Sequence, residues 1–113
     1  MTLKKLVIGG AQFGSKYGIS NKYNYKLNDV KNNINFLKSK KINCFDTSYL
    51  YQNSNKIIGA LNQDRTNKYY AKFFIDEKKI LNSKNRSEYL EYFFNKIFKE
   101  LNTKKIYCLS FHR

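Results

Sequence analysis

The chain has 113 residues and a formal net charge of +14 at pH 7. This length suits one domain or part of one, and an apolar content of 42% is enough for a core. A charge this basic raises the question of nucleic acid or an anionic membrane surface. The lysines are spread along the whole chain and only three residues are Arg. We therefore expect a solvated lysine surface rather than a dedicated nucleic-acid face.

The cysteines and the apolar runs indicate the cellular compartment of the protein. Cys44 and Cys108 each lie in an apolar run typical of a strand, and their spacing matches neither CxxC nor a metal site. This predicts two buried thiols in a reducing cytoplasm, with no metal. No apolar run approaches the roughly 20 residues of a membrane span. The apolar segment at the start is too short for a signal peptide, so we expect a cytoplasmic protein.

The first quarter of the chain predicts a strand followed by a helix. The apolar run 5–9 indicates a buried strand that stops at two glycines, and polar residues 11–24 indicate a loop. Asn28 is a suitable N-cap, with Asp29 at the positive end of the helix. One apolar face then follows, formed by Val30, Ile34 and Leu37.

Two further strands and a short helix come next. Residues 42–45 (INCF) predict a strand, and Ser54 is the expected cap of a short helix. A polar loop at 62–68 then leads to a third strand at 69–74 (YYAKFF).

The last third of the chain predicts the longest helix and a final strand. Ser87 is the expected N-cap of the helix. The apolar side chains that follow at helical spacing form one stripe, namely Leu90, Phe93, Phe94, Ile97 and Leu101. Residues 105–111 (KIYCLSF) predict the strand. The resulting β-α-β-α-β-α-β order indicates right-handed crossovers and a parallel sheet. Both the open doubly wound sheet and the (β/α)8 barrel use this alternation, and pattern alone does not separate them.

Polar residues follow or interrupt three of these strands. Asp46 ends the second, Lys72 lies inside the third, and His112 follows the fourth, while Tyr51 lies in the loop after Asp46. Working residues of parallel α/β folds collect at the carboxyl ends of strands. A lysine in an apolar strand is costly to bury unpaired, so we expect Lys72 to contact Asp46.

Each of these residues also has an ordinary structural explanation. Asp46 could be a loop or capping acid, Tyr51 is one of ten tyrosines, and His112 could be a polar residue ending a strand. Together with Lys72 they form a set of groups whose chemistry is complementary. A lysine paired with an acid lowers the pKa of an adjacent tyrosine and lets it exchange a proton near neutral pH. An imidazole nearby can orient a carbonyl oxygen.

Four motifs resemble the aldo-keto reductase family. Residues 46–59 (DTSYLYQNSNKIIG) resemble its D-T-A-x-x-Y-G-x-S-E-x-x-L-G pattern. Residues 9–21 (GGAQFGSKYGISN) are similar to G-T-A-Q-F-G-x-x-Y-G-I-x-N of one bacterial branch. The strand 69–74 resembles the family's lysine-bearing third strand, and 101–113 (LNTKKIYCLSFHR) resembles L-x-x-x-x-I-D-L-Y-L-L-H-x-P. The motifs are in the family's order and cover the chain.

The resemblance implies a (β/α)8 barrel that uses NADPH to reduce an aldehyde, ketone or sugar to an alcohol. Tyr51 would donate the proton to the carbonyl oxygen, with its pKa lowered by Lys72. Asp46 would pair with Lys72, and His112 would orient the substrate. The cofactor would contact Gly9, Gly10, Ala11 and Asp46. The cofactor supplies the hydride chemistry and the protein positions it.

Three positions depart from the family pattern without touching the four catalytic positions. Gln52 replaces the glycine after the tyrosine, and Asn55 replaces the glutamate after the serine. Lys41 replaces a glycine before the second strand. A lysine there would weaken a left-handed turn by ~1 kcal/mol.

A full barrel needs about 250 residues. We therefore expect residues 1–113 to form one partial aldo-keto reductase domain, namely the first half of the barrel with four parallel strands and three helices, truncated after strand four. The first interpretation is a truncated form with little or no activity alone. Open strand edges would favour self-association or a partner that supplies the second half.

Two alternatives remain open. The first is an active reductase assembled from two or more chains. The second is a small basic nucleic-acid-binding protein. The net charge and the aromatic residues favour the nucleic-acid-binding alternative. The sequence, however, has no recognisable nucleic-acid-binding motif, and its aromatics fall on core-facing stripes. The sequence does not identify the substrate.

Overall fold

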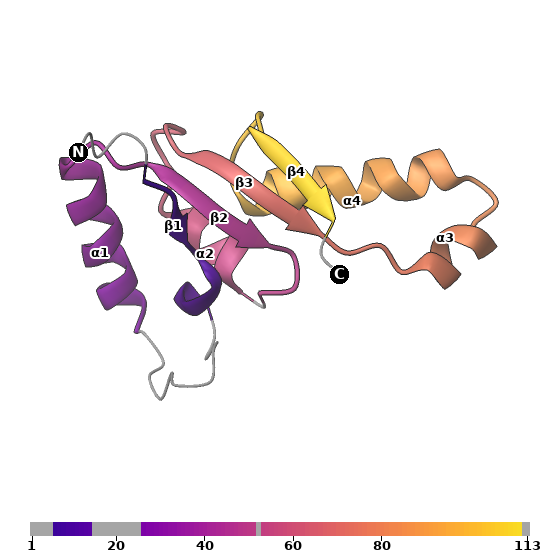
Figure 1. Ribbon diagram of the computed structural model, residues 1–113, viewed down its shortest axis with the longest axis horizontal. Helices are drawn as coiled ribbons and strands as arrows, with labels where there is room; N and C mark the ends of the chain where they lie inside the picture. Colours follow the sequence, from indigo (N-terminus) through magenta and orange to yellow (C-terminus); the bar gives the residue numbers. More distant parts are fainter. Residues whose placement is uncertain (1–5, 15–25, 52, 112–113) are drawn as a thin grey trace.

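The computed structural model describes residues 6–14, 26–51 and 53–111. Four strands form one sheet in the order β1-β2-β3-β4, and each pairs in parallel with the next. The strands are β1 (Ile8–Gly9), β2 (Cys44–Ser48), β3 (Lys68–Phe73) and β4 (Cys108–Phe111). Figure 1 shows their arrows running the same way. This sequential order is that of a barrel, because a doubly wound sheet reverses its strand order at a switch point.

Three predicted helices make the crossovers, and a fourth was not predicted. The crossovers are α1 (Leu27–Ser39), α2 (Ser54–Ala60) and α4 (Arg86–Glu100). The additional helix, α3 (Glu77–Asn82), follows β3. It has no buried residue and thus no apolar stripe to reveal it, but Asp76 caps it by accepting from the Lys78 and Lys79 N–H groups at 3.1 and 3.2 Å. A 3-10 turn, η2 (Ala11–Phe13), follows β1.

The three predicted caps were wrong by one or two positions. The N-cap of α1 is Lys26, whose N–H donates to Asp29 Oδ2 at 3.2 Å, so Asn28 lies inside the helix. Ser87 lies inside α4, because Asn85 Oδ1 accepts from the Glu88 N–H at 3.1 Å and caps it. Ser54 is the first residue of α2, and its hydroxyl is used elsewhere.

The strand boundaries also differ from prediction. The first strand was expected at residues 5–9, and among the described residues it is β1 at Ile8–Gly9. The second strand was expected at residues 42–45, but β2 begins two residues later and continues to Ser48. Residues 46–48 are polar and follow the apolar run 42–45, yet they pair with residues 70–72 of β3. The third strand is shifted by one residue, and the fourth begins only at Cys108.

The core lies between one face of the sheet and the three crossover helices. Its buried members come from α1, β2, α2, β3, α4 and the residue that caps α4, namely Val30, Ile34, Phe45, Ile58, Tyr69, Phe73, Ile97 and Leu101. Helix α2 packs closely on α4 at Gly59, where a Cβ would collide with the Glu100 carbonyl oxygen. The helices therefore cover one face, as on the outside of a barrel.

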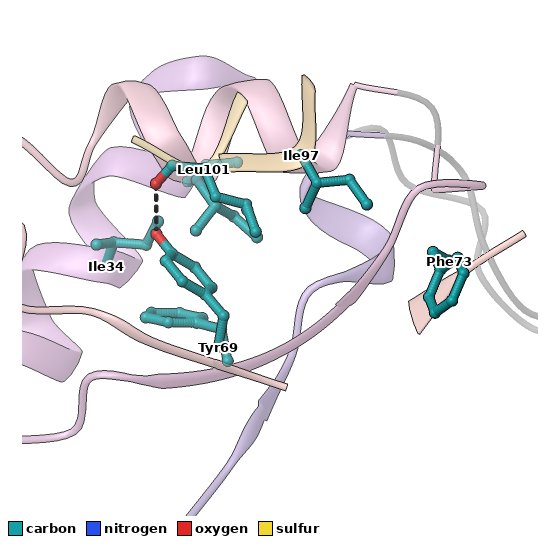
Figure 2. Close-up of a cluster of buried hydrophobic side chains, with 8 residues drawn as sticks. Ile34, Tyr69, Phe73, Ile97 and Leu101 are labelled. Carbon is teal, nitrogen blue, oxygen red and sulfur yellow. Dashed lines mark hydrogen bonds between the residues drawn. The ribbon is translucent and has the colours of Figure 1, made fainter. Parts of the chain in front are cut away.

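A buried tyrosine joins this core to the end of α4. In Figure 2 the Tyr69 hydroxyl points at the Leu101 carbonyl, to which it donates at 3.1 Å. The same hydroxyl accepts from Asn67 Nδ2 at 3.2 Å. Burial raises the pKa of Tyr69 to about 12. The hydrogen bonds satisfy a polar group that would otherwise be costly in a core.

Two predictions about side-chain burial were wrong. Cys44 is half-buried and Cys108 is exposed, so the thiols are not both in the core. Several aromatic side chains are also exposed, among them Tyr70, Tyr107 and Phe111. Cys44, Cys108 and Tyr70 lie on the face of the sheet that the helices do not cover. Phe111 instead lies on the helix side, where its ring centre is 4.5 Å from that of Phe73, and it is exposed on the edge strand β4. No helix within the described ranges is long and apolar enough to cross a membrane.

The left-handed turn before β2 allows a direct stability test. Lys41 has φ 59°, whereas its neighbour Lys40 has φ −91°. Replacing Lys41→Gly should raise the free energy of unfolding by ~1 kcal/mol, because glycine adopts positive φ without a steric penalty. Urea denaturation measures this. Lys40→Gly, which removes the same charge, should not stabilise the chain; equal effects would contradict the explanation.

Tyr69 should make stability fall at alkaline pH. Its folded pKa lies above its ordinary value of 10.0, so its contribution is complete below about pH 10 and is lost as pH rises towards 12. Tyr69→Phe should cost ~1 kcal/mol at pH 8 by removing the bond to Leu101, and this cost should shrink above pH 10. Urea denaturation across this range measures both effects. Tyr92→Phe, at a position 69% exposed, serves as the control, and it should change neither the stability at pH 8 nor its fall at alkaline pH.

Candidate active site

Two consecutive turns carry Tyr51 back over the carboxyl end of β2. The Tyr51 N–H donates to the Ser48 carbonyl at 3.0 Å, and the Ser54 N–H donates to the Tyr51 carbonyl at 2.9 Å. The Ser48 hydroxyl also accepts from the Leu50 N–H at 3.2 Å. These bonds fix the path between β2 and α2. Tyr51 ends 8% exposed, far more enclosed than a typical loop tyrosine.

Asp46 and Lys72 form an ion pair across neighbouring strands, as the sequence predicted. Lys72 Nζ lies 2.8 Å from Asp46 Oδ1. The two residues are a diagonal pair, since Asp46 is in register with Tyr70 and Lys72 with Ser48. Their neighbours on the strands pack against the helices, so alternation turns both side chains to the opposite face. Both remain about one-third exposed.

Lys72 also approaches Tyr51. Its Nζ lies 6.0 Å from the centre of the Tyr51 ring, at the limit of a cation–π contact. The hydrogen bond to Asp46 is the main cause that raises the pKa of Lys72, with smaller contributions from the charge of Asp46 and from Tyr51. Lys72 is therefore a stable cation at neutral pH. The structure thus brings together three of the four predicted catalytic residues.

Three side chains of residues 46–59 hold this loop through hydrogen bonds that the sequence did not predict. The Ser54 hydroxyl donates to the Ala11 carbonyl at 3.2 Å and accepts from the Gly14 N–H at 3.0 Å. Thr47 Oγ1 donates to Asn55 Oδ1 at 2.6 Å, with both residues buried. The serine, threonine and asparagine of the 46–59 motif are the signal that could have revealed these contacts. They tie α2 to β2 and to the turn after β1.

The glycines after β1 differ in their surroundings. A Cβ on Gly10 would lie 2.8 Å from Ile58 Cδ1, and the Gly10 N–H donates to the Asp46 carbonyl at 2.7 Å. Close packing therefore explains why position 10 is a glycine. Gly9 is the register partner of Asp46, and nothing lies within 4 Å of its Cβ position. The space that a Gly9 side chain would fill is therefore open on the face that carries Asp46. Ala11 lies next to it in η2.

His112 lies outside the described residues, so its role stays a prediction. Its predecessor Phe111 is in register with Phe73, and Ser110 is in register with Lys72. Among residues 6–14, 26–51 and 53–111, no group of three His, Cys, Asp or Glu side chains could hold a metal ion.

Comparison with known proteins identifies the family. The profile of the Aldo/keto reductase family matches residues 5–113. The crystal structure of a "putative aldo-keto reductase" from Pseudomonas aeruginosa superposes with a TM-score of 0.65 at 16% identity, covering 94% of this chain and 41% of that one. A search of curated proteins found no match. The chain belongs to the aldo/keto reductase family, and it spans less than half the length of this structural neighbour.

The ion pair should couple Lys72 to Asp46 in stability. Because both side chains are partly solvated, a double-mutant cycle with Lys72→Met and Asp46→Asn should give a coupling of only ~0.5 kcal/mol at pH 8. The folded pKa of Lys72 is raised above 10.5, so this coupling should be complete at pH 8 and disappear as pH rises through the folded value. Urea denaturation at several pH values measures it. Coupling that persists after the lysine has lost its proton would contradict the assignment.

Proposed function

We propose that this chain carries the acid–base half of an aldo-keto reductase site, which reduces a small aldehyde, ketone or sugar carbonyl to an alcohol with NADPH. The observation that supports this most is the Lys72–Asp46 pair at 2.8 Å, with Tyr51 over it at the carboxyl ends of β2 and β3. Family membership supports the class of reaction.

In this proposal Tyr51 donates a proton from its hydroxyl to the carbonyl oxygen. A fixed ammonium beside a phenol favours the phenolate that forms when the proton leaves. Asp46 holds that ammonium in place and keeps it charged, because it accepts a hydrogen bond from Lys72 Nζ. His112 would hydrogen-bond the same carbonyl oxygen and orient the substrate.

The open face at Gly9 and Asp46 would hold the nicotinamide end of the cofactor, which supplies the hydride when bound. Gly10 shapes this region through its packing on α2, and Ala11 lies at its edge. The remaining part of a barrel, on this polypeptide or on another, would supply the contacts to the rest of the cofactor. A second copy of the chain is the simplest other source.

NADPH titration with a small aldehyde as substrate tests the proposal. We expect a saturable change in nicotinamide fluorescence and aldehyde-dependent NADPH oxidation at chain concentrations at which copies associate and complete the site. Tyr51→Phe should keep the fluorescence change and lower the oxidation rate at least ~100-fold, as for loss of a general acid. Tyr49→Phe is the matched control, because Tyr49 packs on Phe93 and contacts Lys96 instead. No fluorescence change up to millimolar NADPH, or equal losses in both variants, would contradict the proposal.

A further inference from the structure

A cluster of cations surrounds a depression at the end of the sheet opposite to Asp46 and Lys72. The depression has a volume of about 350 Å³ and lies between the loop that precedes β3 and the loop that precedes β4. Its lining includes Arg65, Lys68, Lys104 and Lys105. The first two cations flank the start of β3, and the other two lie three and four residues before β4.

No carboxylate lines this depression. Asp64, the nearest acid along the chain, is engaged by Lys38 at 2.9 Å. The two ion pairs found among the described residues include none of the four cations. Lys68 Nζ instead lies 5.2 Å from the centre of the Tyr107 ring. Four like charges around one small depression repel one another, and a bound anion would relieve this repulsion.

A buried amide in the same lining lacks a hydrogen-bond donor. Asn67 is 6% exposed, and its Nδ2 donates to the Tyr69 hydroxyl at 3.2 Å. This bond assigns the amide orientation, because the Tyr69 proton is already given to Leu101. Asn67 Oδ1 is then the one buried side-chain polar atom, among the residues that the structure describes, without a hydrogen-bond partner. This oxygen is enclosed beneath the lining, so Asn67 ties the wall of the depression to the core through Tyr69 rather than presenting a group to a ligand.

We propose that this depression binds the phosphate group of a small phosphate monoester. The phosphate dianion would lie among the four cations, where the Arg65 guanidinium can donate two parallel hydrogen bonds to it. The volume falls at the lower end of small-ligand pockets. The site does not depend on the proposed reductase chemistry, since Lys68 and Lys72 lie at opposite ends of β3.

Binding of ribose 5-phosphate at low salt, followed by isothermal titration calorimetry, tests this site. We expect one saturable site. Replacing Lys104→Ala together with Lys105→Ala should weaken binding at least ~tenfold, by removing charge-assisted bonds. Arg65→Gly should weaken it by about fivefold or more, and its φ of 53° suits glycine, so folding is preserved. The matched control, Lys56→Ala with Lys99→Ala, removes the same charge from the groove between α2 and α4 and should change affinity less than about twofold.

Four further measurements complete the test. Ribose without phosphate should not bind, and inorganic phosphate should compete with ribose 5-phosphate for the site. Lys72→Met should leave binding intact, so failure of the reductase proposal would not affect this one. Equal weakening in the two double-lysine variants would overturn the proposal. So would binding of a 20-nucleotide RNA with steep salt dependence while ribose 5-phosphate does not bind, because that result indicates a general polyanion surface.

Discussion

The parallel pairing of β2 with β3 is the constraint on which the rest of the structure depends. Its register runs from Cys44 opposite Lys68 to Ser48 opposite Lys72. This register sends Phe45 and Tyr69 into the helix-covered core and turns Asp46 and Lys72 to the other face. A slip of one residue would exchange the two faces, burying a charge and exposing an aromatic ring. Core packing therefore also sets the position of the ion pair.

The loop after β2 is closely tied down. Its turns place the centre of the Tyr51 ring 6.0 Å from Lys72 Nζ, which pairs with Asp46, and the path between strand and helix has little freedom. Hydrogen bonds from Thr47 and Ser54 hold that path to α2 and to the turn after β1. The asparagine at position 55, where the family pattern has glutamate, still accepts the threonine proton. The departure thus keeps the contact while removing a charge.

Much of the fold could be predicted because the apolar stripes of α1 and α4 and the short strand runs carry the helical and strand periods. The ion pair was predictable because a lysine in an apolar strand requires a partner. Helix α3 was missed because it buries no residue, and β2 was placed too early because its polar half is stabilised by pairing rather than by burial. The cation cluster could not be predicted, because Arg65 and Lys104 are far apart in the sequence and come together only when β3 pairs with β4.

In the proposed site Asp46 holds Lys72 as a charged partner for Tyr51, and an NMR titration of the Lys72 side chain tests this role most directly. With ¹⁵N-labelled lysine, the Lys72 resonance can be assigned from its absence in Lys72→Met. The structure predicts that the pKa of Lys72 lies above its ordinary value of 10.5 and falls towards that value in Asp46→Asn. A Lys72 titration that is identical in the wild-type chain and in Asp46→Asn would contradict the account.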